Sequence, residues 1–297
     1  MAKQTFKFPL SGSRNTTTIR SHNLFDSSYN EPNKAPIDIY EENMLTYKRL
    51  VGCFTLDVEN NQYISLAEIG NKEWNNLSNL LILGFISSVE SYLRKIIRKV
   101  LLIDNTSRNR SYNKSISYGA ASYHSRELLP EALIEDCSFH SAYNIKEAVK
   151  DMLGINLNDL KNKPELKTAF DDYNFIAELR HCVVHRCGFF GSNNALTLGI
   201  EQYKDFLEKP IKLNITVLLE AANACDNLVK ELNDVIFSEL LSRSLDTYPW
   251  TGNLTQDKNY FDKYFYIFSP ENKHVERLTC YHNFRDTYNL KFRARTS

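Results

Sequence analysis

Three basic side chains, Arg180, His181 and His185, crowd one end of a segment that is expected to be helical. His181 and His185 are four residues apart and are therefore neighbours on one helix surface. Arg180 and His185 lie about 140° apart around the helix, with His181 inside that arc. An arginine offers a permanent forked donor to phosphate oxygens, and a histidine can move a proton near neutral pH. Together these residue types could bind a phosphate group and transfer a proton beside it.

Arg180 also falls in the row of its helix that should be packed. That row contains Leu166, Phe170, Tyr173, Ala177, Arg180, Val184 and Cys187. An arginine there needs an anionic partner, a polar interface or a ligand, since burying an unpaired charge is costly. The alternative is a helix end with ordinary basic residues, which the helix dipole favours.

A carboxylate on an earlier helix offers a complement to Arg180. Glu90 interrupts a second apolar row, which contains Ile82, Ile86, Leu93 and Ile97. If the two helices pack antiparallel, Glu90 could hold Arg180 in position. A plain structural ion pair is an equally good interpretation of Glu90. For His181, orientation of the pair and simple surface exposure are likewise both open.

Four amphipathic segments must position these residues, and each shows apolar side chains every three or four residues. They cover about residues 73–100, 142–153, 164–187 and 215–236. Pro164 is a natural first-turn residue, and Gly188 offers the stop of the third segment. The sequence therefore predicts an all-α fold, an up-and-down helical bundle.

The segments around the bundle give weaker signals. We expect an N-terminal extension over 1–65, the bundle over 66–245 and an aromatic-rich C-terminal extension over 246–297. Residues 1–35 are polar, 41–50 could form a short helix, and 53–58 alternate like a strand. Residues 195–212 could form a short hairpin or an irregular excursion. The run YFDKYFYIF, residues 260–268, could form strands of a small appendage.

The composition is that of an ordinary globular protein. Lys plus Arg equals Asp plus Glu, at 36 each, so any RNA contact must come from a local patch and not from overall charge. The N-terminus lacks the apolar run of a signal peptide, and the longest apolar stretch, 80–86, is too short to span a bilayer. These features predict a cytoplasmic protein that makes no membrane contact.

The cysteines indicate free thiols and no metal site. The six show no CxxC pairing, which is typical of a reducing compartment. Cys182 and Cys187 flank His185, but no second ligand pair lies at a usual spacing for zinc. We therefore expect neither a metal nor a cofactor, and we expect these two thiols to pack as small apolar groups.

The C-terminal tail carries a second basic cluster. Lys291, Arg293 and Arg295 follow aromatic residues at 281, 284 and 288 and could contact RNA by charge and stacking. The favoured alternative is a small packed appendage with a solvated basic end.

The segment RHCVVH, residues 180–185, resembles the R-[N/D/H]-x-x-x-H signature of HEPN domains. The surrounding IAELRHCVVHRCG is similar to the usual motif helix, which ends in a glycine after the histidine. FISSVESYLRKII, which contains Glu90, is similar to the first HEPN helix, which commonly carries an acidic residue near this place. The resemblance covers roughly residues 73–241. His181 stands where the family most often has asparagine.

The resemblance implies a metal-independent endoribonuclease. HEPN ribonucleases usually form two-fold dimers in which both motif helices face one composite cleft. Arg180 would bind the scissile phosphate and stabilise the charge of the transition state. His185 would act as acid or base while the 2′-hydroxyl of the RNA attacks. The product would carry a 2′,3′-cyclic phosphate, and DNA, which lacks the nucleophile, would be left intact.

The resemblance also implies partners. HEPN ribonucleases are usual in bacterial toxin–antitoxin and anti-phage (abortive-infection) systems, where cleavage of tRNA or mRNA halts growth. An antitoxin or sensor protein is then expected beside the RNA and a second copy of the chain. The alternative from another class is a non-catalytic HEPN module that binds a nucleotide, RNA or a partner enzyme. Silent relatives often lose the arginine or the histidine, and both are present here, which favours activity. A helical scaffold unrelated to HEPN would leave the position of Arg180 unexplained.

Overall fold

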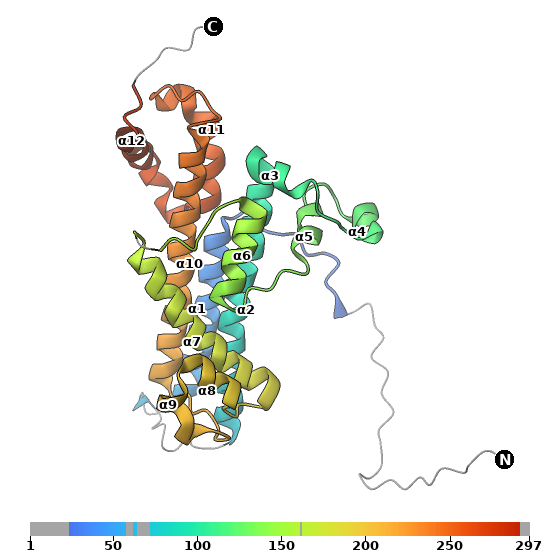
Figure 1. Ribbon diagram of the computed structural model, residues 1–297, viewed down its shortest axis with the longest axis vertical. Coiled ribbons are helices and arrows are strands. Elements are labelled where there is room, and N and C mark those ends of the chain that lie inside the picture. Colours follow the sequence, from blue (N-terminus) through green and yellow to red (C-terminus); the bar gives the residue numbers. More distant parts are fainter. Residues whose placement is uncertain (1–23, 58–61, 64–71, 161, 292–297) are drawn as a thin grey trace, which may run out of the picture. The chain divides into compact units, whose positions relative to one another are not determined.

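The computed structural model describes residues 24–57, 62–63, 72–160 and 162–291 (Figure 1). The chain divides into two units, Met1–Asn33 and Lys34–Ser297. In the first unit the described residues, 24–33, are exposed, and the carboxylate of Asp26 accepts a hydrogen bond from the N–H of Ser28 at 2.9 Å. The second unit contains all the residues singled out above.

Among the described residues, four long helices form the centre of the second unit (Figure 1). They are α1 (Pro36–Thr55), α2 (Lys72–Ile103), α7 (Pro164–Arg186) and α10 (Ile215–Ser244). Helix α10 packs against α1, α2 and α7, and α2 packs against α1 and α7. The buried stripe of α2 includes Phe85, Val89 and Ile96, which are 0% exposed. The all-α bundle predicted from such stripes is confirmed.

Helix α6 (Ala142–Leu153) packs against α2 and α7 and has the bounds expected from the sequence. The Ser141 hydroxyl caps its first turn by accepting from the N–H of Asn144 at 3.2 Å. Gly154 ends the helix with a φ of 72°, a left-handed conformation that glycine adopts without steric cost. Local capping thus sets both ends of α6.

Short elements fill the connections. They are β1 (Leu56–Asp57), β2 (Gln62–Tyr63), α3 (Asn105–Ser111), α4 (Tyr118–Tyr123), α5 (Leu129–Ile134), α8 (Ser192–Leu198), α9 (Ile200–Tyr203) and the 3-10 helix η2 (Lys204–Phe206). The two strands pair antiparallel with Leu56 opposite Tyr63. The segment between α7 and α10, which includes the possible hairpin at 195–212, consists mainly of the helical turns α8, α9 and η2. It contains one isolated bridge, between Phe189 and Pro210. Helix α1 is longer than the helix expected over 41–50, and it includes the first residues of the segment expected to alternate as a strand.

The C-terminal region is helical, so the prediction of strands there is wrong. YFDKYFYIF lies in α11 (Leu254–Phe268), which the 3-10 helix η3 (Glu271–Glu276) and α12 (Arg277–Thr287) follow. Phe261, Phe265 and Phe268 recur every three or four residues and are buried. This helical spacing outweighs the β-propensity of aromatic residues, which depends on context.

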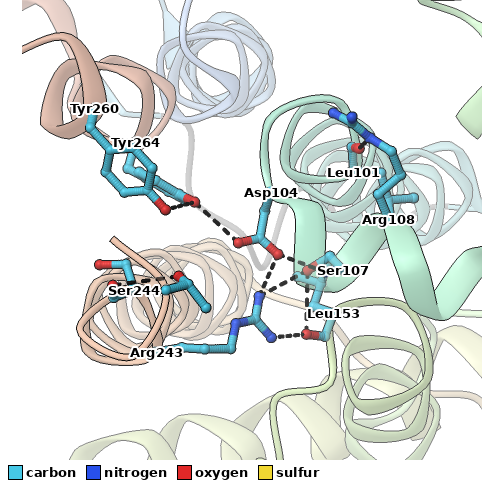
Figure 2. A network of polar contacts seen from close by, with 10 residues as sticks. Leu101, Asp104, Ser107, Arg108, Leu153, Arg243, Ser244, Tyr260 and Tyr264 are labelled. Carbon is cyan, nitrogen blue, oxygen red and sulfur yellow. Dashed lines mark hydrogen bonds and ion pairs between the residues drawn. The ribbon is translucent and has the colours of Figure 1, made fainter. Parts of the chain in front are cut away.

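A buried polar network joins α11 to the bundle (Figure 2). The Asp104 carboxylate accepts from Arg243 at 2.6 Å, from the Tyr264 hydroxyl at 3.1 Å and from the N–H of Ser107 at 2.6 Å. Arg243 also donates to the carbonyl of Leu153 at 2.6 Å. Helices α1, α11 and α12 belong to the same compact unit as the bundle, Lys34–Ser297. This unit extends across the boundaries expected after residues 65 and 245.

Candidate active site at the end of helix α7

Helix α7 ends sharply after the basic residues. Arg186 is its last residue, and Cys187 and Gly188 adopt left-handed conformations with φ of 52° and 84°. The N–H of Gly188 donates to the carbonyl of Cys182 at 3.0 Å and so satisfies a carbonyl of the last turn. A Cβ at Gly188 would lie 2.7 Å from the side-chain nitrogen of Asn79 on α2. The predicted stop is thus confirmed, and glycine at position 188 leaves room for Asn79 of α2 beside the end of α7.

Arg180 lines an open pocket of about 560 Å³ on the surface of α7. Its side chain is half-buried and forms no hydrogen bond or ion pair with any residue that the structure describes. Asn174, His181 and the loop residue His140 line the same pocket. A guanidinium without an internal partner keeps its donors available for an anionic ligand.

The charges of Glu90 and Arg180 both influence the buried phenol of Tyr173. Burial raises the pKa of the Tyr173 phenol well above its ordinary value; the charge of Glu90 raises this pKa further and that of Arg180 lowers it. Both charged groups therefore lie close enough to the phenol to affect its ionisation.

Glu90 pairs with His140 and not with Arg180. Its Oε1 lies 2.9 Å from Nδ1 of His140, in the loop between α5 and α6. No ion pair joins Glu90 to Arg180 in the described part of the chain, so the pairing expected from the sequence is not formed. From α2, Arg94 anchors this loop by donating to the carbonyl of Cys137 at 3.0 Å. The sequence gives no signal for His140 beyond its residue type, since a loop has no periodicity.

His181 is held by Asn194, a second residue that the sequence analysis missed. The side-chain nitrogen of Asn194 lies 3.1 Å from Nδ1 of His181 and donates to Oε2 of Glu178 at 2.7 Å. Its oxygen accepts from the N–H of Gly191 at 3.2 Å, which fixes the orientation of this buried amide. Nδ1 of His181 is therefore an acceptor, and the neutral ring carries its proton on Nε2. His181 is therefore a half-buried, anchored ring and not a simply exposed one.

His185 lies beside the pocket and does not line it. Its ring is exposed, and its centroid lies 4.6 Å from that of His181 with an interplanar angle of 59°. The structure thus brings Arg180, His181 and His140 to one pocket and places His185 in ring contact with its His181 side.

The two cysteines near the motif do not converge. Cys182 is buried, and burial raises the pKa of its thiol, whereas Cys187 is exposed. Cys182 therefore packs as a small apolar group, as expected, whereas the same expectation is wrong for Cys187, whose side chain is exposed.

The tail cluster is only partly within the described residues. Lys291 is exposed, and Arg293 and Arg295 lie outside the described residues. Tyr281 and Phe284 are buried, so neither ring is available to stack on a base. For these two aromatics the packed-appendage interpretation is confirmed.

No protein-family model matches the chain, and no curated protein or solved structure matches it either. None of the helices that the structure describes is both long enough and apolar enough to cross a lipid bilayer. A functional assignment therefore depends on the motif and on the geometry of this pocket.

Proposed function

We propose that the chain is a cytoplasmic, metal-independent endoribonuclease of the HEPN type. The observation that carries this proposal is the guanidinium of Arg180, which has no partner among the described residues and lines a pocket beside the rings of His181 and His185. A permanent cation next to titratable rings supplies charge stabilisation and proton transfer, the two requirements of phosphoryl transfer.

In this reaction Arg180 binds the scissile phosphate and stabilises the charge that develops on its non-bridging oxygens. The 2′-hydroxyl attacks phosphorus, and His185 gives a proton to the departing 5′-oxygen. His181, whose Nδ1 accepts from Asn194, presents Nε2–H as a donor. The products are a 2′,3′-cyclic phosphate and a 5′-hydroxyl end.

A homodimer is part of the proposal because His185 does not line the pocket of its own chain. Val184 and Phe189 are each 44% exposed around the end of α7. Exposed apolar side chains beside the motif suit a two-fold contact in which both α7 ends face one cleft. In such a contact His185 can complete a site that includes Arg180.

The biological role that follows is a regulated one. Neutral overall charge disfavours indiscriminate RNA binding, so a selective target such as a tRNA or an mRNA fits better. We propose a toxin or anti-phage effector that an antitoxin or sensor protein restrains.

The test is cleavage of total RNA in the presence of EDTA. We expect wild-type protein to cut RNA and leave cyclic phosphate ends, and Arg180→Ala and His185→Ala to lower the rate by about 10²–10⁴-fold. Lys167→Ala is the matched control, since Lys167 is an exposed cation on α7 roughly 20 Å from Arg180. Cleavage that survives both site substitutions would show that the assignment is wrong. An intact wild-type dimer that binds RNA or nucleotide without cleaving it would favour the non-catalytic module.

A further inference from the structure

His140 sits at the centre of a chain of hydrogen bonds that ends in a carboxylate. Its Nδ1 lies 2.9 Å from Oε1 of Glu90, and its Nε2 lies 2.7 Å from Oγ of Ser138. The side-chain amide of Asn144 donates to the same Oγ at 2.8 Å. His140 itself lines the pocket of Arg180.

The hydrogen-bond partners of His140 indicate which of its ring nitrogens carries the proton. An ionised carboxylate only accepts hydrogen bonds, so Glu90 fixes the proton of neutral His140 on Nδ1. Nε2 is then an acceptor, and the Ser138 hydroxyl, which accepts from Asn144, donates to it. An imidazole whose Nδ1–H is held by a carboxylate and whose Nε2 accepts from a hydroxyl is arranged as a general base.

The loop that carries His140 is fixed on both sides of the ring. Phe139 is 0% exposed, and its carbonyl accepts from the Tyr173 hydroxyl at 2.9 Å. Two residues after His140, the N–H of Ala142 donates to Oδ1 of Asn174 at 2.9 Å. Tyr173 and Asn174 both belong to α7, so the helix that carries Arg180 also positions the loop. A base needs such a fixed position to meet its substrate in the right geometry.

We propose that His140 is the general base of this site and that Glu90 is its positioning residue, an assignment that rests on the proposed ribonuclease function. Cleavage requires one group to remove the 2′-hydroxyl proton and another to protonate the 5′-oxygen. His185 supplies only one of these groups, and His140 supplies the other from within the pocket of Arg180.

The bond from O2′ to phosphorus forms while the O2′ proton passes to Nε2 of His140, where the substrate hydroxyl replaces that of Ser138. The bond from phosphorus to O5′ breaks while the proton of His185 passes to O5′. Glu90 stabilises the imidazolium that forms on His140. Proton exchange with water then restores both rings.

A first experiment tests whether substrate reaches His140 without requiring turnover. The full-length protein, with histidine and arginine side chains isotopically labelled, is titrated with an RNA oligonucleotide that carries 2′-fluorine in place of every 2′-hydroxyl. We expect the NMR signals of the His140 ring and of the Arg180 guanidinium to shift. Those of His124, an exposed histidine outside the pocket lining, should stay in place. A shift at Arg180 alone would overturn the role of His140 and leave the ribonuclease proposal standing. No shift at either residue would overturn both.

A second experiment identifies the base by kinetics. His140→Ala should lower kcat by about 10²–10⁴-fold with little change in KM, and added imidazole should restore part of the rate. His124→Ala is the control for loss of a histidine elsewhere.

A substrate with a 4-nitrophenyl leaving group separates base from acid, because such a group departs without protonation. On this substrate His185→Ala should approach the wild-type rate, and His140→Ala should remain slow. A wild-type rate for His140→Ala on RNA would overturn the proposal. A defect in His140→Ala that disappears on the activated substrate would also overturn it, since His140 would then act as the acid.

Discussion

Glu90 orients His140 across fifty positions of the chain, with Oε1 and Nδ1 2.9 Å apart. Glu90 therefore has His140, and not Arg180, as its partner. The carboxylate is engaged by the loop imidazole and forms no ion pair with the guanidinium, so the donors of Arg180 stay available for a phosphate, although Asp171 and Glu178 also line the pocket. Had Glu90 bound Arg180, the same residues would have formed a closed structural pair.

The first prediction concerns the tautomer that Glu90 selects. Glu90→Gln keeps the shape of the side chain, but its amide nitrogen can donate to Nδ1 and so place the proton of His140 on Nε2. A ring in that tautomer cannot accept the 2′-hydroxyl proton, so kcat should fall by about 10²–10⁴-fold. Rates on RNA, together with a thermal melt to show intact folding, measure this effect.

A purely structural role of Glu90 predicts the opposite result, because a near-isosteric glutamine would then leave the rate unchanged. Glu147→Gln is the matched control, since this α6 carboxylate is 44% exposed and lies outside the lining of the Arg180 pocket.

The sequence predicts the bundle well because helical periodicity is a local property. The bounds of α6 were predicted correctly, since Ser141 and Gly154 mark its two ends within the chain itself. Helix α11 was predicted wrongly because its aromatic residues suit either a strand or a packed helix, and their buried neighbours decide between the two.

The sequence likewise predicts only part of the candidate site. Arg180 and His181 reach one pocket because fixed helix geometry relates them, and their spacing is visible in the sequence. His140 reaches that pocket only because Tyr173, Asn174 and Arg94 hold its loop in place. Those contacts join segments far apart in the chain, and no local pattern encodes them.

A second prediction tests the polar network that joins α11 to the bundle (Figure 2). The Asp104 side chain is 8% exposed and pairs with Arg243, so Asp104→Ala leaves a largely buried guanidinium without its counter-charge. We expect the free energy of unfolding to fall by about 3–5 kcal/mol, measured by urea denaturation. Glu201→Gln, which breaks the surface pair with Lys204, should cost at most about 1 kcal/mol. Equal effects of the two substitutions would mean that the network contributes no more than a surface pair.

A third prediction concerns alkaline pH. Burial raises the pKa of the Tyr92 and Tyr173 phenols and of the Cys225 thiol well above their ordinary values. Above about pH 9–10 the unfolded chain loses these protons while the folded chain keeps them. Stability is therefore fully present below that range and falls as pH rises through it, by up to about 1.4 kcal/mol per pH unit for each group.

Urea denaturation from pH 7 to 11 measures this fall. Tyr92→Phe removes one of the phenols, so its curve should decline less steeply above pH 10 than that of wild type. An equal decline in both proteins would exclude a contribution from Tyr92.

The last prediction separates the two left-handed residues that end α7. Cys187 has a side chain at a φ of 52°, which costs about 1–2 kcal/mol, whereas glycine adds about 0.5–1 kcal/mol of chain entropy to the unfolded state. Because the Cys187 side chain is exposed and little packing is lost, Cys187→Gly should stabilise the protein by roughly 0.5–1 kcal/mol.

Gly188→Ala should act in the opposite direction. Its φ of 84° strains any side chain, and the new Cβ would lie 2.7 Å from the Asn79 amide nitrogen. The end of a flexible side chain can move away, so the strained backbone should account for most of a loss of about 1–2 kcal/mol. Combining Asn79→Ala with Gly188→Ala removes the contact between the two side chains and leaves the backbone strain at position 188. Thermal denaturation of the single and the double variant then measures how much of the loss comes from each. Full recovery in the double variant would instead assign the whole cost to contact with α2.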